Sequence, residues 1–538
     1  PPELGSLSYL EELWLSENEL SGSLPPELGN LSNLECIFLG VNFFSGSIPT
    51  EVGRLGRLAL LSLRQNQLSG SLPPELGALD NLEGTVLHLN NLSGSIPPEI
   101  GGLIRIAELD LSANQLSGPL PPELGNLSSM VDLVLSENTL SGSIPAELGR
   151  LEILERLLLG FNHLKGSLPP ELGNLGRLRE LVLNSNQLSG SLPSELGKLG
   201  SLEVLHLSDN SFSGSIPLEL GSLSRLRGML LSHNRLNGSL PPELGRLGGL
   251  GRLDVSVNSL SGSLPPDFGE LGQLTTLIVE GNQLLTGSLA PLESMGELRE
   301  VYAEDCSFGT AAALPPLLEV LHLSGNRLRA VPYEWRSQYL GSLRRLRLDR
   351  NQIASWELTG VLPDEAFWVG GALGCGFDFI QPHLSWPLLA HVNISGNPLG
   401  IRARDFLHSL AYLPSLLTLE AASCALHGNV PWERGDSLVP AILWNMSCSG
   451  DGTNELSGFQ SLVRLDLSNN SILALDSPPP ETLLLADLSL NKLSSVHADW
   501  YNEAGSRMIA LLDVSGNPEL QTPVGIIVGG ACPISGAG

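Results

Sequence analysis

Few residues in this chain have the types and spacing that catalysis requires. Ser437, in the segment GDSL at 435–438, is the best candidate nucleophile. A serine hydroxyl must be activated by a histidine base, and no DxxH element near the end of the chain supplies one. The Gly-rich segment GALGCG at 371–376 does not follow a clean strand pattern, so it does not predict a nucleotide site. We therefore expect a protein that is not an enzyme.

Carboxylates recur every 24 residues and could in principle hold Ca²⁺, which prefers oxygen ligands. Each also falls where a short helix would begin, and negative charge is favoured at a helix N-terminus, so we expect this second role. The ten histidines include no HExxH motif or paired metal spacing, and we expect no metal and no cofactor. The carboxylate column is Glu3, Glu27, Glu51, Glu75, Glu99, Glu123, Glu147, Glu171, Glu195, Glu219, Glu243 and Asp267.

A row of serine hydroxyls follows the same period. It includes Ser21, Ser45, Ser69 and Ser93. A regular hydroxyl lattice could bind an ordered surface such as ice, but polar turn residues would produce the same row. Neither reading involves a covalent step.

The elements that position these side chains are repeats with the pattern LxxLxLxxNxL. In LEELWLSENELSGSLPPELGNLSNL (10–34), Leu13 and Leu15 alternate with residues that we expect to be exposed, as in a half-buried strand. An asparagine amide has two donors and an acceptor, so a stacked column can satisfy turn backbone that is buried. The spacing of 24 predicts such a ladder at Asn18, Asn42, Asn66, Asn90, Asn114, Asn138, Asn162, Asn186, Asn210, Asn234, Asn258 and Asn282.

The recurring segment SGSLPPELG turns each repeat back toward its start. Gly22 permits left-handed backbone, and Pro25 and Pro26 fix φ and can begin a short helix. Leu28 then points toward the core, and Gly29 relieves crowding between repeats.

The pattern becomes irregular after residue 289. We divide the chain into regular 24-residue repeats at 1–289 and irregular repeats of 20–27 residues at 290–538 that continue the same solenoid. Cysteines take the ladder position where asparagine is missing, at Cys306, Cys375, Cys424 and Cys448. This assignment gives about 22 coils, and the coils at Cys375 and Cys448 are the weakest matches.

The longer pattern LxxLxLxxNxLSGSLPxELGxLxxL resembles the plant-type leucine-rich repeat. This class forms the ectodomains of plant receptor-like kinases and receptor-like proteins, and also the polygalacturonase-inhibiting proteins. The resemblance implies an α/β solenoid, a horseshoe or superhelix with a parallel sheet on its concave face and short 3-10 or helical turns on its convex side. It also implies an extracellular or cell-surface protein that binds its ligand on the concave face.

Charge and hydropathy restrict the partners further. The net charge of −28 argues against nucleic acid and anionic membranes. No run of 18 apolar residues occurs, so we expect no membrane insertion within this chain. Seven N-x-S/T sequons permit a secreted glycoprotein, while the absence of a CxxC motif leaves an intracellular protein possible. The chain begins at Pro1 within a repeat, and we expect a fragment or a processed chain.

Apolar residues on the outward side of the predicted strands are the candidate ligand contacts. They lie four residues before each ladder position, or directly before it. A face with no core to fill should be polar, and an exposed apolar patch marks an interaction site, although strand propensity also favours such residues. The candidates are Trp14, Phe38, Val41, Val86, Val134, Leu158, Phe161, Val182, Leu230, Ile278 and Tyr302. Trp356, Trp368, Trp386, Trp432 and Trp444 could form a second surface or fill irregular coils.

The leading hypothesis is a recognition scaffold that binds a protein or peptide on its concave face, as the ectodomain of a receptor-like protein. The first alternative is a secreted inhibitor of a cell-wall hydrolase. The second is a structural protein that binds the cell wall or ice. The sequence does not identify the ligand or the oligomeric state.

Overall fold

The structure is a computed structural model of the 538-residue chain. It describes residues 2–311, 313–331, 335, 341–354, 388–400, 403, 415–430, 462–475, 483–496, 511–517 and 520. The chain divides into two compact units, residues 1–284 and residues 285–538. Each unit is described by itself.

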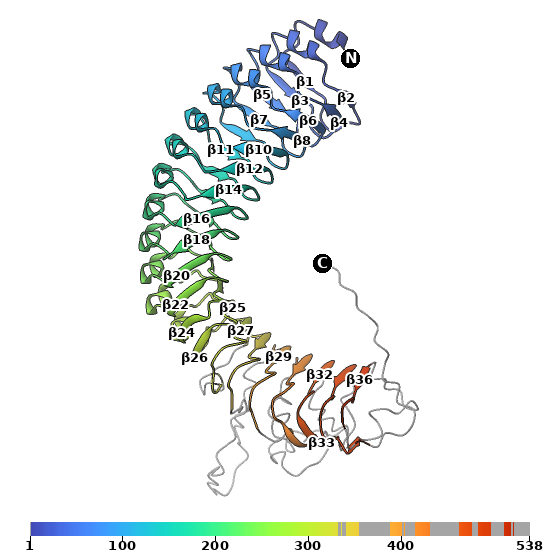
Figure 1. The fold of residues 1–538 in the computed structure, drawn as a ribbon, viewed down its shortest axis with the longest axis vertical. Helices are drawn as coiled ribbons and strands as arrows, with labels where there is room; N and C mark the ends of the chain where they lie inside the picture. Colours follow the sequence, from blue (N-terminus) through green and yellow to red (C-terminus); the bar gives the residue numbers. More distant parts are fainter. Residues whose placement is uncertain are drawn as a thin grey trace, which may run out of the picture. The chain divides into compact units, whose positions relative to one another are not determined.

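One short strand from each repeat builds a parallel sheet along the concave side of the first unit (Figure 1). Neighbouring strands pair in register with a shift of 24 residues, as in Leu133 beside Leu157. The strands are β1 (Glu12–Trp14), β3 (Cys36–Phe38), β5 (Leu60–Ser62), β7 (Gly84–Val86), β9 (Glu108–Asp110), β11 (Asp132–Val134), β13 (Arg156–Leu158), β15 (Glu180–Val182), β17 (Val204–His206), β19 (Gly228–Leu230), β21 (Arg252–Asp254) and β23 (Thr276–Ile278).

A second parallel sheet forms where the chain leaves each ladder asparagine. Each strand contains the glycine of the Leu-Ser-Gly segment or of a variant of it, and Gly22 has a φ of 91° that disfavours any residue with a Cβ. Its strands in this unit are β2 (Ser21–Ser23), β4 (Phe43–Gly46), β6 (Gln67–Ser71), β8 (Asn91–Gly94), β10 (Gln115–Pro119), β12 (Thr139–Gly142), β14 (His163–Gly166), β16 (Gln187–Ser191), β18 (Ser211–Gly214), β20 (Arg235–Ser239) and β22 (Ser259–Ser263).

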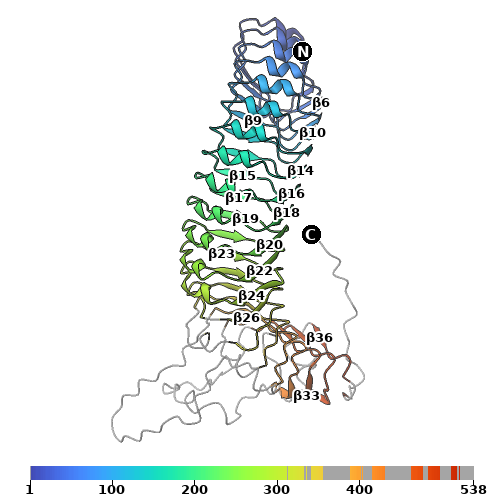
Figure 2. The same ribbon diagram turned by 60° about the vertical axis from the view of Figure 1, so that its left-hand side comes forward.

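Short 3-10 helices stack along the convex side, which Figure 2 shows turned toward the reader. In the second repeat Pro25 is extended and Pro26 begins the helix, as its fixed φ favours. The helices are η1 (Pro2–Ser6), η2 (Pro26–Asn30), η3 (Thr50–Arg54), η4 (Pro74–Ala78), η5 (Pro98–Gly102), η6 (Pro122–Asn126), η7 (Ala146–Arg150), η8 (Pro170–Asn174), η9 (Ser194–Lys198), η10 (Leu218–Ser222), η11 (Pro242–Arg246) and η12 (Pro266–Glu270).

The 3-10 helices pack against each other backbone to backbone. A Cβ added at Gly173 would meet the carbonyl oxygen of Glu195 in the next helix at 2.4 Å. A glycine is therefore required at this position of the repeat, because any side chain would force neighbouring coils apart.

The core of the first unit is a stack of leucines. Leu157 and Leu159 in one strand region, Leu164 in β14 and Leu172 in the 3-10 helix η8 are all fully buried. Every repeat supplies the same positions, so the core continues through the unit from coil to coil.

The second unit continues with the same kind of strand but with less regular spacing. Its strands pair in parallel, as in Leu321 beside Leu346. Its elements are β24 (Leu284–Ser288), which begins at the unit boundary, η13 (Ala290–Ser294), β25 (Glu300–Tyr302), β26 (Ser307–Thr310), β27 (Val320–His322), β28 (Arg345–Arg347), β29 (His391–Asn393), β30 (Thr418–Glu420), β31 (His427–Val430), β32 (Arg464–Asp466), β33 (Ser471–Leu475), β34 (Leu485–Asp487), β35 (Ser495–Val496) and β36 (Leu511–Asp513).

The predicted coils at Cys375 and Cys448 do not stand where the spacing places them. Strand β28 pairs directly with β29, and β30 pairs directly with β32, so no further strand fits between the members of either pair. The two cysteines themselves lie outside the described residues. The expected count of 22 coils is therefore wrong by these two.

Candidate binding surface

Asparagines of the ladder hold neighbouring coils together and so fix the strands. The amide nitrogen of Asn162 donates to Leu135 O in the preceding coil at 3.0 Å and to Leu159 O in its own coil at 3.2 Å. Its Oδ1 accepts from the N–H of Leu140 at 3.0 Å. One buried side chain thus satisfies backbone groups of two coils. Asn42, Asn66 and Asn282 make the same set of bonds, and Asn18, in the first coil, donates to Leu15 O and Ser16 O.

Two of the ladder cysteines are described, and both are buried thiols. The Cys424 thiol donates to Ile394 O at 3.2 Å and to Ala422 O at 3.5 Å, which are the kinds of partner that an asparagine amide has. Burial raises the pKa of Cys424 to about 11. The Cys306 thiol donates to Glu304 O at 3.4 Å.

The outward column of the first unit is mostly half-buried, because side chains in adjacent strands lie side by side at the same register. Leu158 has Val134 on one side and Val182 on the other. Two members depart from this pattern: Trp14 is 63% exposed and Ile278 only 9% exposed. Phe38, Val86, Val134, Leu158, Val182 and Leu230 are half-buried, as is Tyr302 in the second unit. Ile278, taken as an outward contact from the sequence, is thus a buried side chain.

The two aromatic residues at the start of this column form a pair. The rings of Trp14 and Phe38 lie 4.2 Å apart between centroids and are tilted by 30°. The indole N–H of Trp14 donates to a carboxylate oxygen of Glu12 at 2.8 Å. The pair is therefore a fixed aromatic surface rather than two independent side chains.

Residues directly before the ladder asparagines have left-handed backbone. Val41, Leu89 and Phe161 have φ values of 57°, 56° and 55°, which are unfavourable for residues with a Cβ. Leu89 is 47% exposed and Phe161 56% exposed. The conformation turns these side chains away from the core, so large apolar residues here are held at the surface.

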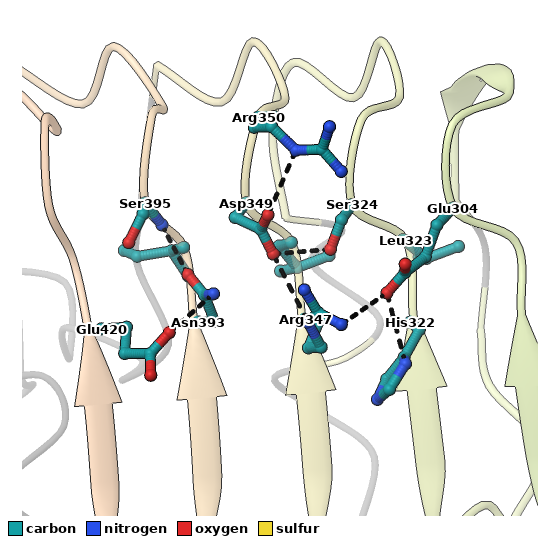
Figure 3. A network of polar contacts seen from close by, with 12 residues as sticks. Glu304, His322, Leu323, Ser324, Arg347, Asp349, Arg350, Asn393, Ser395 and Glu420 are labelled. Atoms are coloured by element: carbon teal, nitrogen blue, oxygen red, sulfur yellow. Dashed lines mark hydrogen bonds and ion pairs between the residues drawn. The ribbon is translucent and has the colours of Figure 1, made fainter. Parts of the chain in front are cut away.

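Charged residues replace apolar ones on the second unit's sheet (Figure 3). One carboxylate oxygen of Glu304 lies 3.3 Å from His322 Nδ1 and 3.0 Å from an Arg347 Nη. The hydrogen bond from His322 lowers the pKa of Glu304, and the charge of Arg347 lowers it further. Asp349 accepts from the Ser324 hydroxyl and pairs with Arg350 at 3.4 Å. These charged groups pair with one another across three neighbouring strands.

Sequence reasoning on the outward face considered two positions of each repeat and missed a third. The residue two before the ladder asparagine also lies on the outward face, and it places Arg64 and His88 beside the predicted apolar contacts. Counting two residues back from each ladder asparagine would have identified both residues in the sequence. The five tryptophans considered as a second surface lie outside the described residues.

Two kinds of site do not occur in the described part of the chain. No group of three or more His, Cys, Asp or Glu side chains is arranged to hold a metal ion there. None of the helices that the structure describes is long and apolar enough to cross a membrane.

Comparison with known families identifies the class of protein. The leucine-rich repeat region family matches residues 195–358. The single leucine-rich repeat matches residues 9–31, 57–79, 105–127, 154–175, 177–199 and 461–485. The chain is a leucine-rich-repeat protein with the solenoid fold of that family.

Solved structures of plant receptors are similar to this chain. The plant peptide hormone receptor RGFR1, in complex with RGF2, is 28% identical with a TM-score of 0.74, and the match covers 92% of this chain and 76% of the receptor. A TDR receptor is 28% identical with a TM-score of 0.73, covering 92% and 78%. The Arabidopsis receptor kinase HAESA, in complex with the peptide hormone IDA and the co-receptor SERK1, is 26% identical with a TM-score of 0.70, covering 97% and 89%. Comparison of the sequence with curated proteins finds no match.

Proposed function

We propose that this chain is a non-enzymatic recognition scaffold, the ectodomain of an extracellular receptor-like protein, that binds a peptide or protein on the concave face of its first unit. The observation that carries the proposal is the exposed apolar surface of that face. Trp14, Leu89 and Phe161 are each about half exposed or more, and they lie on a sheet face that has no core to fill. Apolar side chains also lie together on this face: Trp14 packs on Phe38, and Leu158 stands between Val134 and Val182. Contiguous apolar surface of this kind marks an interaction site.

The rigidity of the face supports this function. Contact side chains stand on strands whose backbone is fixed on both sides by parallel pairing and by the asparagine ladder. A surface that is already ordered loses little conformational entropy when a ligand binds, so more of the contact energy becomes affinity. An extended peptide could lie across several strands and contact one outward side chain from each.

An extracellular location is part of the proposal. The similar structures are named as receptors, two of them in complex with peptide hormones. Asn30, Asn91, Asn126 and Asn237 begin N-x-S/T sequons, and all four are exposed. Glycans could be attached to these asparagines without unfolding a coil.

Selection from a random peptide library displayed on phage tests the proposal. The purified chain should enrich peptides, and Leu158→Ser and Phe161→Ser should reduce their capture by about tenfold or more, as expected for anchor residues. The matched control is Leu218→Ser, since Leu218 is 54% exposed at the start of the convex helix η10. Equal capture by all four proteins, or enrichment of no peptide, would contradict the proposal.

The alternative functions stay predictions. A depletion assay with pectin-degrading enzymes tests the inhibitor, and a thermal-hysteresis measurement tests ice binding. Ser21, Ser45, Ser69 and Ser93, the row behind the ice alternative, lie in the second sheet and are exposed or half-buried.

A further inference from the structure

A row of small polar residues runs along the outward face of the first unit, two positions before each ladder asparagine. In four consecutive coils this row is buried, and Asn184 is only 5% exposed. The row lies between the apolar column on one side and the residues directly before the ladder on the other, so it forms the floor of the outward face. We call Gly160, Asn184, Ser208 and Ser232 the polar floor.

The amide of Asn184 has an unused acceptor. Its Nδ2 donates to the Ser185 hydroxyl at 3.2 Å, whereas its Oδ1 accepts no hydrogen bond from the residues that the structure describes. In the same described part of the chain, the unpaired polar atoms that are fully enclosed belong to Glu27, Thr85 and Glu304. Asn184 Oδ1 is not among them, so it remains accessible, and the outward face is the side from which a ligand can reach it.

The neighbouring coil fixes the position of this acceptor. A Cβ at Gly160 would come within 2.5 Å of Asn184 Oδ1, so the missing side chain leaves the space in which the amide oxygen lies. The N–H of Phe161 donates to Asn184 O at 2.9 Å and holds the two coils in register at this point. Oδ1 is therefore ordered before a ligand binds, which reduces the entropic cost of a new hydrogen bond.

The surroundings of Asn184 are apolar. Leu158 and Val182 lie side by side in the column on one side of the floor, and Phe161 is exposed on the other side. His206 stands beside Val182 in the next strand, and burial lowers the pKa of its imidazole, which is therefore neutral at pH 7. Apolar surroundings strengthen a hydrogen bond that a ligand makes to the Asn184 amide.

A second unused group of the polar floor lies in the following coils. The hydroxyls of Ser208 and Ser232 share one hydrogen bond of 2.9 Å, so one hydroxyl hydrogen of the pair has no acceptor within the described ranges. The floor thus offers a neutral acceptor and, further along, a neutral donor. A peptide main chain has an N–H and a C=O at nearly every residue, so these two groups can bind different residues of one ligand.

We propose that the polar floor binds the main chain of an extended peptide, and that Asn184 Oδ1 accepts a hydrogen bond from one main-chain N–H. This inference rests on the proposed function and names the part of the ligand that is recognised. Successive side chains of an extended chain point to opposite sides. With its N–H directed at the floor, the peptide places them alternately against Leu158 and Val182 and against Phe161. The residue bound to Asn184 cannot be proline, which has no N–H.

Replacement of amides by esters in a bound peptide tests the inference. Phage selection on the unaltered chain supplies the peptide, and a synthetic series then replaces each amide in turn with an ester, which has no N–H. At one position the ester should weaken binding to the unaltered chain by about fivefold, as the loss of one hydrogen bond predicts. On Asn184→Ala, calorimetry should show less than about a twofold difference between that ester and the parent peptide.

Asn174→Ala is the matched control, because Asn174 is an exposed asparagine at the end of the convex helix η8. This variant should show the full effect of the ester. Asn184→Ser is a second test variant that introduces the residue found at the same position in the next coil, Ser208. It should behave as Asn184→Ala does, because a serine side chain is too short to reach the same ligand atom. Thermal unfolding of each variant checks that the fold is retained.

The outcomes separate this inference from the proposed function. Selected peptides whose binding depends on Leu158 and Phe161 but tolerates an ester at every position would overturn the inference alone. An ester effect that is equally large in the unaltered chain, Asn184→Ala and Asn184→Ser would do the same. Enrichment of no peptide on any protein would overturn both proposals.

Discussion

The hydrogen bonds of buried polar atoms determine how individual residues affect the stability of this array. An asparagine at the ladder position donates twice and accepts once, whereas a thiol has a single hydrogen, which Cys424 shares between two carbonyl oxygens. Cys424 therefore keeps the carbonyl partners of the ladder but carries an ionisable group into the core. This replacement makes the stability of the second unit sensitive to alkaline pH.

Titration of Cys424 should lower the free energy of unfolding as the pH rises. Burial raises its pKa from 9.0 to about 11, so its contribution is fully present below pH 9 and is lost as the pH rises toward 11. At pH 10.5 we expect Cys424 to lower the free energy of unfolding by about 2 kcal/mol relative to pH 8. Chemical unfolding at both pH values measures this loss, and Cys424→Ala should show a loss smaller by that amount. An equal loss in the variant would show that the thiol does not titrate as expected.

Thr85 is a polar residue at a leucine position of the core. It lies beside Leu61 and Leu109 in the parallel sheet, it is only 3% exposed, and its hydroxyl has no hydrogen-bond partner in the described part of the chain. Burying an unpaired hydroxyl costs about 1–3 kcal/mol. Thr85→Val keeps the shape and removes that cost, so we expect the free energy of unfolding to rise by about 1 kcal/mol. Thr85→Ser keeps the hydroxyl and should not stabilise; thermal unfolding of both variants makes the comparison.

The sequence predicts the secondary-structure elements best, because every coil repeats the same pattern of leucines, prolines and glycines. The spacing of 24 residues correctly predicts the parallel strands, the proline-initiated turns and the leucine core. It fails between Asn351 and Asn397, because 46 residues have nearly the length of two coils. Length alone cannot distinguish an inserted segment from a coil, and Gly370 and Ala372 lack the apolar side chains that a strand needs.

The outward face could be predicted only in part. Alternation along a strand indicates that Trp14 and Leu158 point away from the core. It does not show that Asn184 lies over Gly160 or that Asp110 accepts a hydrogen bond from His88, since these contacts join residues in different coils. The burial of Ile278 likewise depends on neighbouring coils and not on its own repeat.

The glycine column on the convex side is a requirement of helix packing. Gly173→Ala would place a Cβ 2.4 Å from the carbonyl oxygen of Glu195, and a backbone atom cannot move aside as a flexible side chain can. We expect a loss of several kcal/mol in the free energy of unfolding, at the upper end of the range for overpacking of about 1–3 kcal/mol or beyond it. Circular dichroism during thermal unfolding measures the effect.

Gly176 is the matched control for this substitution. It lies three residues later in the same coil, has no atom within 4 Å of an added Cβ and has no left-handed φ. Gly176→Ala should therefore leave stability within about 0.5 kcal/mol of the unaltered chain. If the two alanine variants unfold at the same temperature, close approach of the helices does not limit this position.

At the scale of the whole molecule, contacts between neighbouring coils carry the stability of the first unit. Strand β11 pairs with β9 on one side and β13 on the other, and the ladder asparagine of each coil reaches only the coil before it. Such arrays behave approximately as a sum of repeat and nearest-neighbour terms. The number of coils can therefore change without loss of the fold, provided that the period is kept.

Deletion of one complete period tests this view. Removing residues 115–138 joins Asn114 to Thr139, so a ladder asparagine is still followed by the Leu-Ser-Gly segment. Strand β9 should then pair with β13 in the register that β11 now uses, and the shortened protein should fold with the same circular dichroism spectrum per residue. Removing only 115–126 breaks the period, leaves ladder and leucine positions out of register and should abolish protection of the flanking strands from hydrogen exchange. Equal protection in the two deletions would mean that the fold does not depend on the 24-residue period, and unfolding of the full-period deletion would mean that β11 makes contacts beyond its neighbours.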